Sequence, residues 1–286
     1  MQKCKKTGKP PKNDCIHYLA ANQYFMKFFI LTCCTLTLLL SSCGGGEQKQ
    51  ETPATDTTAK DSVIVDFPAE VDSLLSKFPR KDTWPLVLDS ITVSKTTEGD
   101  SLPSKDFKYL NKNAPKKIGS LDYPQSDWVI NSYLMIDSIK QAGGYTSYLE
   151  TLDLGMIKDS KAYALFHMQA NDSTLLFFYG IDYMSYEACP WSRGTYVFMT
   201  VVYGNKLGES ILVAMEEAGG DPPAYGCSSI SLELQENLNY HVRLFSLSDE
   251  DMDSPEIDTQ TVFRHFMIKQ SEILKDGTKE KGYTIY

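Results

Sequence analysis

Apolar and polar residues alternate over short segments in the second half of the chain, with turn residues between the segments. Such alternation is typical of strands that bury one face. Around position 242, for example, Tyr240, Val242 and Leu244 share one face, while His241 and Arg243 point to the other. The segments predicted as strands are 161–169, 174–180, 195–203, 209–215, 229–234, 240–247 and 261–270.

Residues that favour turns separate these segments. Asn171-Asp172, the glycine-containing stretch 204–208 and Glu236-Asn237 each lie between two predicted strands, and Asp276-Gly277 follows the last one. Successive hairpins build an antiparallel sheet. We therefore predict a mainly β domain whose antiparallel hairpins form a sandwich or a half-barrel.

One to three short helices are predicted in the N-terminal part of this domain. At 68–78, Val71, Leu74 and Phe78 recur at spacings of three and four, and Pro68 suits a first helical turn. A second short helix is predicted at 104–110. The stretch 126–142 is ambiguous, because its apolar residues are too dense to define a period.

An uncharged apolar run occupies 28–40, directly after Met26-Lys27. Its 13 residues are fewer than the roughly 18–20 that a helix needs to span a bilayer. A short apolar run followed by small residues is typical of a secretory signal. The run ends in Leu40-Ser41-Ser42-Cys43.

This ending resembles the lipobox of bacterial lipoproteins. The resemblance covers 26–43 and implies that the Cys43 thiol receives a diacylglycerol, that the signal is cut before Cys43, and that the new N-terminus is acylated. More than one acyl chain is needed for stable anchoring. Gly44 stands where an aspartate would indicate inner-membrane retention in that family. The resemblance therefore implies an outer-membrane lipoprotein, on either the periplasmic or the surface face.

The chain is accordingly predicted to have four parts. Residues 1–25 are polar and lysine-rich and lie before the signal, so we interpret them as an extension or a misassigned start, with translation beginning at Met26. Residues 26–42 form the signal peptide. Residues 43–62 form a flexible tether, because 44–60 contains no large apolar residue. Residues 63–286 form the β domain.

The composition argues against a nucleic-acid partner. The 286-residue chain has a net charge of −9. Residues 1–42 carry six lysines and one aspartate, so the remainder carries −9 − 5 = −14. An acidic surface is repelled by phosphate groups and by anionic lipid headgroups. The expected membrane contact is therefore the lipid on Cys43 alone.

Motifs for catalysis, cofactors or metals are not recognised. There is no nucleophile elbow, HExxH, phosphate-binding glycine loop or CxxC after Cys43. His167, His241 and His265 each fall in a predicted strand without a nearby ligand-spaced partner, so each is interpreted as an ordinary strand histidine. The acidic stretch 248–258 lacks the glycine and glutamate of a calcium-binding loop. We predict no catalytic residue, cofactor or metal.

Only Cys189 and Cys227 remain beyond the lipidated cysteine. A remaining pair in an exported protein favours a disulfide. Cys189 precedes the predicted strand 195–203 and Cys227 follows 209–215, so both lie at the same end of this hairpin. The alternative is two unpaired buried thiols.

Aromatic residues gather in two segments near these cysteines, which the pattern predicts as loops. Segment 181–194 carries Tyr183, Tyr186, Trp191 and Arg193, and segment 217–228 adds Tyr225. Loops held by a rigid sheet commonly carry function, and Trp, Tyr and Arg are favoured in binding sites. These five residues are the predicted ligand-binding surface. The alternative is that they pack over the disulfide as a small satellite core.

The function expected from the sequence is noncatalytic binding of a glycan, peptide or protein at the cell envelope. Two alternatives stay open. One is an inhibitor of a lysozyme or protease, which a protruding loop would favour. The other is an enzyme of unrecognised type, which convergent carboxylates would favour.

Overall fold

The protein is represented by a computed structural model that describes residues 67–113, 125–153, 155–185, 191–221, 224–249 and 258–275. All of them belong to one compact unit, Ser62–Tyr286. The predicted signal peptide, Cys43, the tether, Tyr186 and Cys189 lie outside the described residues. Within the described ranges, no helix combines the length and apolarity needed to cross a membrane.

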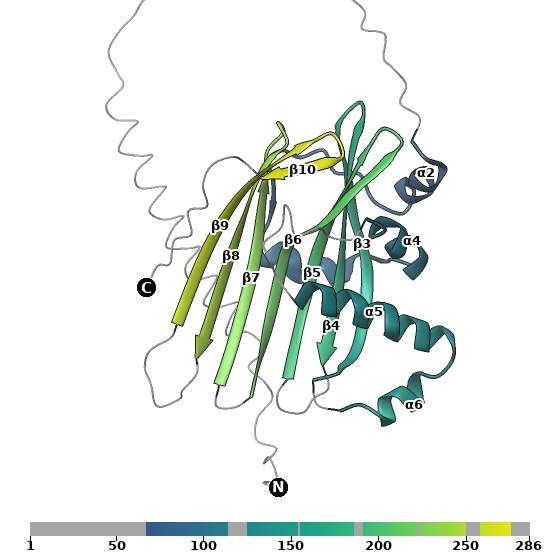
Figure 1. Ribbon diagram of the computed structural model, residues 1–286, viewed down its shortest axis with the longest axis vertical. Helices are drawn as coiled ribbons and strands as arrows, with labels where there is room; N and C mark the ends of the chain where they lie inside the picture. The colour runs from purple at the N-terminus through teal and green to yellow at the C-terminus, as the bar shows by residue number, and fades with distance from the viewer. Residues whose placement is uncertain are drawn as a thin grey trace, which may run out of the picture. The chain divides into compact units, whose positions relative to one another are not determined.

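A ten-stranded sheet dominates the described part (Figure 1). Its spatial order is β10-β9-β8-β7-β6-β5-β4-β3-β2, with β1 paired to β7 off this path, and every ladder is antiparallel. The strands are β1 Leu86–Leu88, β2 Asp100–Ser101, β3 Ile157–Asn171, β4 Thr174–Ser185, β5 Trp191–Tyr203, β6 Lys206–Asp221, β7 Ala224–Leu234, β8 Asn239–Asp249, β9 Asp258–Lys269 and β10 Glu272–Lys275. The predicted mainly β, antiparallel fold is confirmed.

The sheet curls at the end where β6 begins. Strands β6 and β7 pair only over Met215–Asp221, and β1 pairs instead with the last residues of β7. A Cβ atom added at Gly208 would lie 2.5 Å from the carbonyl oxygen of Ser271, so the β9–β10 turn reaches the start of β6. This curvature is visible where β10 crosses the top of the sheet in Figure 1, and it agrees with the predicted sandwich or half-barrel.

The predicted hairpins recur with two changes. The β5–β6 connection is the two-residue turn Gly204-Asn205, shorter than the predicted 204–208, because pairing continues to Tyr203 and Lys206. The last described hairpin turns at Gln270-Ser271, where Gln270 has a φ of 57°. The predicted turn at Asp276-Gly277 lies outside the described residues.

The described residues contain more helix than the one to three short helices predicted. The α-helices are α2 Ala69–Leu75, α3 Ser90–Ser94, α4 Ser104–Leu110, α5 Gln125–Gln141 and α6 Tyr145–Glu150, and a 3₁₀ helix, η1, spans Thr96–Glu98. The ambiguous stretch is helical as α5, which ends before Gly143 at a φ of 74°. Asp89 caps α3 by accepting a hydrogen bond from the backbone N–H of Thr92.

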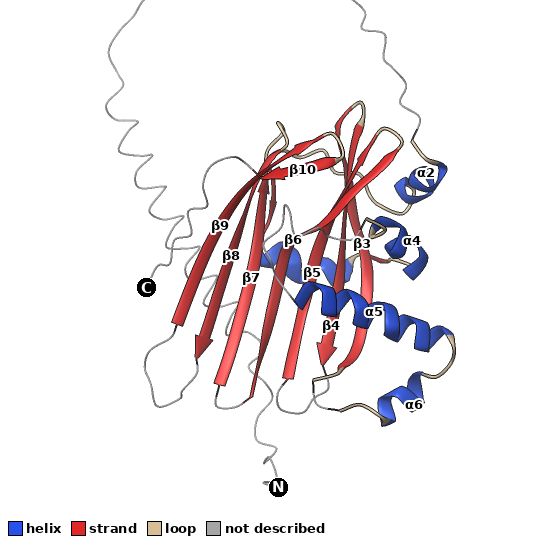
Figure 2. Cartoon of the chain, in the orientation of Figure 1, coloured by secondary structure: helices blue, strands red, loops and turns tan. Residues whose placement is uncertain are grey.

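The two faces of the central strands are covered by different segments. Trp128 of α5 packs edge-to-face on Tyr183 of β4, so we call the face that carries Tyr183 the α5 face. Figure 2 shows α5 lying across the strands on this side. On the opposite face, Thr96 of η1 packs closely against Gly180. A Cβ atom added at Gly180 would lie only 2.3 Å from Cγ2 of Thr96. Cover on both faces explains why most residues of β4 and β5 are buried whatever their direction.

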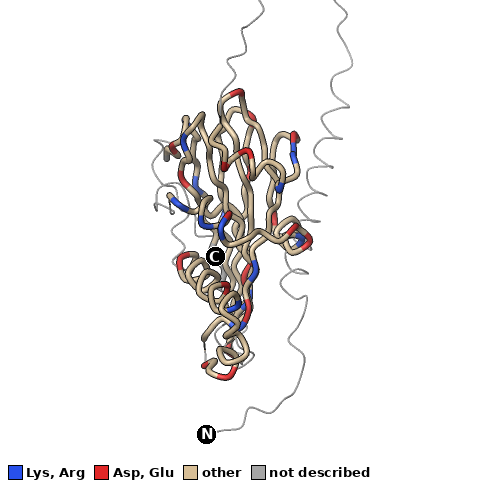
Figure 3. Tube along the Cα trace, turned by 90° about the vertical axis from the view of Figure 1, so that its right-hand side faces the viewer, with Lys and Arg blue, Asp and Glu red and all other residues tan. Residues whose placement is uncertain are grey.

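The core on these strands is rich in aromatic side chains. The largest fully buried ones are Phe78, Phe107, Phe177, Phe178, Tyr179, Tyr183, Tyr196, Phe198 and Tyr240. Charged positions of both signs are interspersed over the helices and the strand ends (Figure 3). Aromatic packing therefore dominates the core of the central strands.

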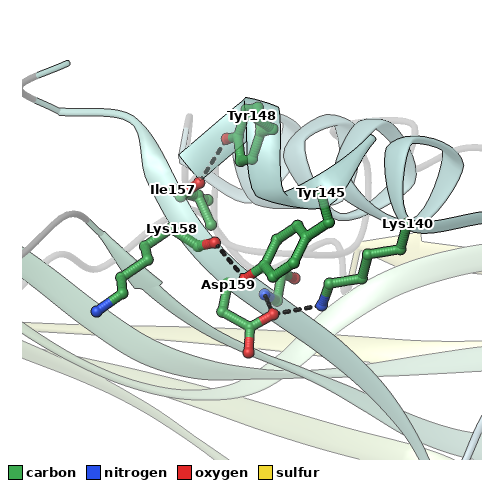
Figure 4. Close-up of polar contacts among 7 residues, drawn as sticks. Lys140, Tyr145, Tyr148, Ile157, Lys158 and Asp159 are labelled. Carbon is green, nitrogen blue, oxygen red and sulfur yellow. Dashed lines mark hydrogen bonds and ion pairs between the residues drawn. The ribbon is translucent and has the colours of Figure 1, made fainter. Parts of the chain in front are cut away.

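Helix α6 closes the free edge of the sheet at the start of β3 (Figure 4). The hydroxyl of Tyr148 donates to the carbonyl oxygen of Ile157 at 2.6 Å, and that of Tyr145 donates to the carbonyl oxygen of Lys158 at 3.0 Å. A register shift between Ile157 and Asp159 marks an irregularity here. The two phenols thus take the place of a neighbouring strand for carbonyls that an edge leaves unpaired.

Candidate functional site

Two aromatic side chains lie on the opposite face at the end of the sheet where β5 begins. Trp191 of β5 and Tyr225 of β7 both pair with Gly220 of β6. Residues directly across an antiparallel ladder point to the same side, so the two rings share one face. A Cβ at Gly220 would lie 3.2 Å from Cδ1 of Tyr225, which shows that the tyrosine ring leans over the glycine.

A cation and an exposed thioether flank these rings. The guanidinium carbon of Arg193 lies 5.9 Å from the centre of the Trp191 ring, within cation–π range. Arg193 pairs across the ladder with Met184, which is 44% exposed. Tyr225 is 37% exposed, and Trp191 and Arg193 are half-buried. The patch is therefore reachable from solvent while its backbone is held by strands on both sides.

Two carboxylates stand one register step further into the sheet. Asp182 of β4, Thr195 of β5 and Glu216 of β6 form one row on the same face as Arg193. Thr195 donates its hydroxyl to Oδ1 of Asp182 at 3.0 Å. We call the set Asp182, Trp191, Arg193, Glu216 and Tyr225 the Trp191 surface.

Burial raises the pKa of both carboxyl groups on this surface. Burial raises the pKa of Asp182, and the hydrogen bond from Thr195 and the charge of Lys161 oppose the rise only in part. Burial likewise raises the pKa of Glu216, against the lowering effect of the Arg193 charge. Both groups would thus interact strongly with a donor or cation that reached them, because their ionised forms are poorly solvated.

A carboxylate on the edge strand β3, that of Asp159, also affects Asp182. Asp159 raises the pKa of Asp182 through repulsion, and Asp159 itself forms an ion pair with Lys140 of α5 (Figure 4). Lys140 also lies 4.8 Å from the centre of the Tyr145 ring. Lys140 of α5 therefore restrains Asp159, the β3 carboxylate whose charge raises the pKa of Asp182.

The predicted binding loops are corrected by this arrangement. Strand β4 runs to Ser185 and β5 starts at Trp191, while β6 runs to Asp221 and β7 starts at Ala224. Trp191, Arg193 and Tyr225 are therefore strand residues, and the structure brings these three together on one face. The glycines and the clustered prolines suggested loops, but the ladder extends almost to the hairpin ends.

Tyr183 does not belong with the other predicted residues. It lies on the α5 face and is 1% exposed. Its hydroxyl donates to Oε1 of Glu217 at 2.5 Å, and that of Tyr196 donates to Oε2 at 2.9 Å. Burial and the Glu217 charge both raise the pKa of Tyr183. This buried Tyr–Glu–Tyr cluster makes Tyr183 a residue of the main core rather than of a satellite core over the disulfide, because Cys227 pairs with Ala218 and therefore lies on the other face.

The structure gives Cys227 as disulfide-bonded. It is buried on β7, opposite Ala218 of β6 and Leu247 of β8. Cys189 lies outside the described residues, as does Tyr186. The pairing of Cys189 with Cys227 and the binding role of Tyr186 therefore stay predictions.

Two features of the opposite face were missed from the sequence. The pairing of Asp182 with Glu216 through Thr195 involves three separate strands, and only the register reveals it. The contact of His241 with His265 was also missed, because 24 residues separate them. Within the described ranges, no three His, Cys, Asp or Glu residues are grouped so as to hold a metal ion.

Comparison with known proteins adds no assignment. No protein-family model matches the chain, and neither a curated protein nor a solved structure matches it. The function is therefore argued from the site alone.

Proposed function

We propose that this chain is a lipid-anchored envelope protein whose β domain binds a glycan, without catalysis, on the Trp191 surface. The observation that carries the proposal is the placement of Trp191 and Tyr225 on either side of Gly220, with Arg193 and two carboxylates beside them. A sugar ring presents an apolar C–H face and a rim of hydroxyls. Aromatic rings suit the first, and a mixture of donors and acceptors suits the second.

The polar groups of the surface supply both hydrogen-bonding roles. Arg193 offers only donors, while ionised Asp182 and Glu216 offer only acceptors. A hydroxyl can satisfy either, so a polyhydroxylated ligand pairs with all three. A ligand of one charge sign would be repelled by part of the set.

The position of the surface argues against a peptide that binds by adding a strand. That mode needs an open sheet edge. The surface lies instead on β4 to β7 in the middle of the sheet, where the main chain is already paired on both sides. Only side chains are left to make contact, which favours a ligand recognised by its faces and hydroxyls.

The test is binding to a glycan array and to isolated envelope polysaccharide, followed by calorimetry on the glycan found. Trp191→Ala and Tyr225→Ala should each weaken binding by about tenfold or more, as hot-spot aromatics do. Phe263→Ala is the matched control, since Phe263 is also 37% exposed and lies 5.8 Å from the guanidinium carbon of Arg243. Equal losses in all three variants, or no glycan bound by the parent protein, would refute the proposal.

Glycan hydrolysis at the same surface is a second candidate. The observation in its favour is that Asp182 and Glu216, two strands apart in one row, both have a raised pKa, as groups at functional sites often do. Hydrolysis requires a pair of carboxyl groups on either side of the bond that breaks. Release of reducing ends by the parent protein, lost in both Asp182→Asn and Glu216→Gln, would select this candidate.

The inhibitor alternative stays open. The acidic charge that suggested it is unchanged, and the two aromatic segments are strands for most of their described length rather than protruding loops.

A further inference from the structure

A row of three polar side chains crosses β7, β8 and β9 away from the Trp191 surface. Glu233 pairs with His241, and His241 pairs with His265. All three side chains therefore point to one side of the sheet. Glu233 and His265 are exposed and His241 is half-buried, so water and small ions reach the row.

The two imidazole rings meet through the same kind of nitrogen. Nδ1 of His241 lies 3.0 Å from Nδ1 of His265, and the ring planes cross at 70°. A hydrogen bond between them requires one ring to carry its proton on Nδ1 and the other to leave that nitrogen bare. On an exposed face this bond competes with water and adds little stability.

The same separation also suits two ligands of one metal ion. With metal–nitrogen bonds of about 2.0–2.1 Å, nitrogens 3.0 Å apart subtend roughly 90–97° at the metal. That is the angle between neighbouring ligands in square-planar and octahedral complexes, which Cu²⁺ and Ni²⁺ adopt with nitrogen ligands. Tetrahedral Zn²⁺ requires a wider angle.

We propose that His241 and His265 form a binding site for a divalent transition-metal ion, with Cu²⁺ bound most tightly. The two Nδ1 atoms are the protein ligands, and water completes the coordination on the exposed side. Imidazole is a favoured ligand of copper and nickel, and Cu²⁺ stands highest in the affinity order of divalent first-row metals.

Glu233 is placed to support this site. Its Oε1 lies 4.0 Å from Nε2 of His241, the nitrogen that faces away from the metal position. At this distance the two atoms are not hydrogen-bonded, but the negative charge of the carboxylate favours a proton on Nε2, which leaves Nδ1 free to bind metal. Gln235 donates to the same oxygen at 2.6 Å and restrains the carboxylate.

The strands make the pair rigid. Strand β8 is hydrogen-bonded along its length to both β7 and β9, so the two histidines cannot separate without breaking the ladder. Holding two ligands at the right distance before the ion arrives lowers the entropic cost of binding. The site needs no other part of the chain and is independent of the glycan proposal.

The test is titration of the full-length protein with Cu²⁺, Ni²⁺ and Zn²⁺, followed by calorimetry and by the electron paramagnetic resonance spectrum of Cu²⁺. We expect one Cu²⁺ per chain, nitrogen coupling in the spectrum and an affinity order of copper, nickel, then zinc. His241→Gln and His265→Gln should each abolish this binding, and Glu233→Gln should weaken it by about tenfold. Affinity should fall on acidification, because both imidazoles must be unprotonated.

The controls separate this site from background binding. Phe263→Ala, one register step away on the same face, should bind copper as the parent does. The double variant His241→Gln/His265→Gln retains His17 and His167 and reports any binding by them. Copper bound equally by parent and double variant, or no copper bound by the parent, would overturn the proposal and leave the pair as a hydrogen bond only.

Discussion

Tyr183 of β4 reaches across β5 to donate its hydroxyl to Glu217 of β6. The residue between them in the ladder is Gly194, which pairs with Tyr183 on one side and with Glu217 on the other. Because Gly194 has no side chain, the tyrosine ring can lie flat over β5. A buried carboxylate is thereby given a donor from two strands away, which offsets part of its desolvation cost.

Gly194→Ala should therefore destabilise the domain. A Cβ there would lie 2.8 Å from the carbonyl oxygen of Glu216 and 3.0 Å from Cε1 of Tyr183, so the ring must move away from Glu217. Overpacking of this kind costs about 1–3 kcal/mol in the free energy of unfolding. Gly226→Ala is the control, because the nearest atom to its Cβ is the carbonyl oxygen of Leu247, 3.5 Å away. Chemical denaturation should show a loss for the first variant alone; similar values for both would contradict the role of Gly194.

Asp182→Asn should stabilise the domain at neutral pH. The folded-state pKa of Asp182 is raised above its ordinary value of 3.8, chiefly by burial. At a pH below 3.8 the carboxyl is protonated in both the folded and the unfolded chain. As the pH rises from 3.8 towards the folded-state pKa, the unfolded chain ionises first, so the folded state loses stability. Asparagine keeps an acceptor for Thr195 but cannot ionise.

The melting temperature of Asp182→Asn should therefore exceed that of the parent at pH 7, and the difference should shrink towards pH 3. A variant that melts lower than the parent at pH 7 would show that the hydrogen bond from Thr195 and the charge of Lys161 outweigh the desolvation of Asp182. Under the proposed function the same variant weakens glycan binding, because asparagine replaces the charged acceptor of the Trp191 surface. Proteins often retain destabilising groups where function requires them.

The alternation of apolar and polar residues and the turn residues predicted the class of fold correctly, but they did not predict where the strands end. Helix α4 has the predicted bounds, and the predicted strands all recur. The segments around Trp191 and Tyr225 were predicted as loops because glycines and prolines are common turn residues. In the structure Gly194 and Gly220 instead make room for aromatic rings within strands, a use that depends on the neighbouring strands and cannot be read locally.

The candidate site could be predicted only in part for the same reason. Composition identified Trp191, Arg193 and Tyr225, whereas separating them from Tyr183 required knowing which face each residue takes. Residues 183 and 191 are both odd-numbered, yet they lie on opposite faces because a hairpin intervenes. Long-range pairs such as His241 and His265 carry no signal in a single sequence.

The predicted Cys189–Cys227 disulfide should contribute substantially to stability. Closing a loop of roughly 40 residues stabilises by about 4 kcal/mol in the chain-entropy model. Cys189→Ser and the double variant Cys189→Ser/Cys227→Ser should therefore lower the melting temperature to a similar extent. Alkylation of the exported protein under denaturing, nonreducing conditions should label neither thiol. Two freely labelled thiols would refute the pairing.

Cys43→Ser should prevent anchoring of the exported protein. Serine has no thiol to accept the diacylglycerol, and in lipoproteins cleavage of the signal depends on that acceptor. The apolar run 28–40 is too short to span a bilayer, so without acyl chains the protein has no stable hold on the membrane. We expect the variant to accumulate as an uncleaved precursor or to leave the membrane fraction.

Cys34→Ser is the matched control, because Cys34 lies inside the predicted signal peptide, which processing would remove. It should mature and fractionate with membranes as the parent does. Metabolic labelling with a fatty-acid analogue should mark the parent and Cys34→Ser but not Cys43→Ser. Normal maturation and membrane fractionation of Cys43→Ser would rule out the lipid anchor. The glycan and copper experiments would be unaffected, because the residues they test all lie in the β domain.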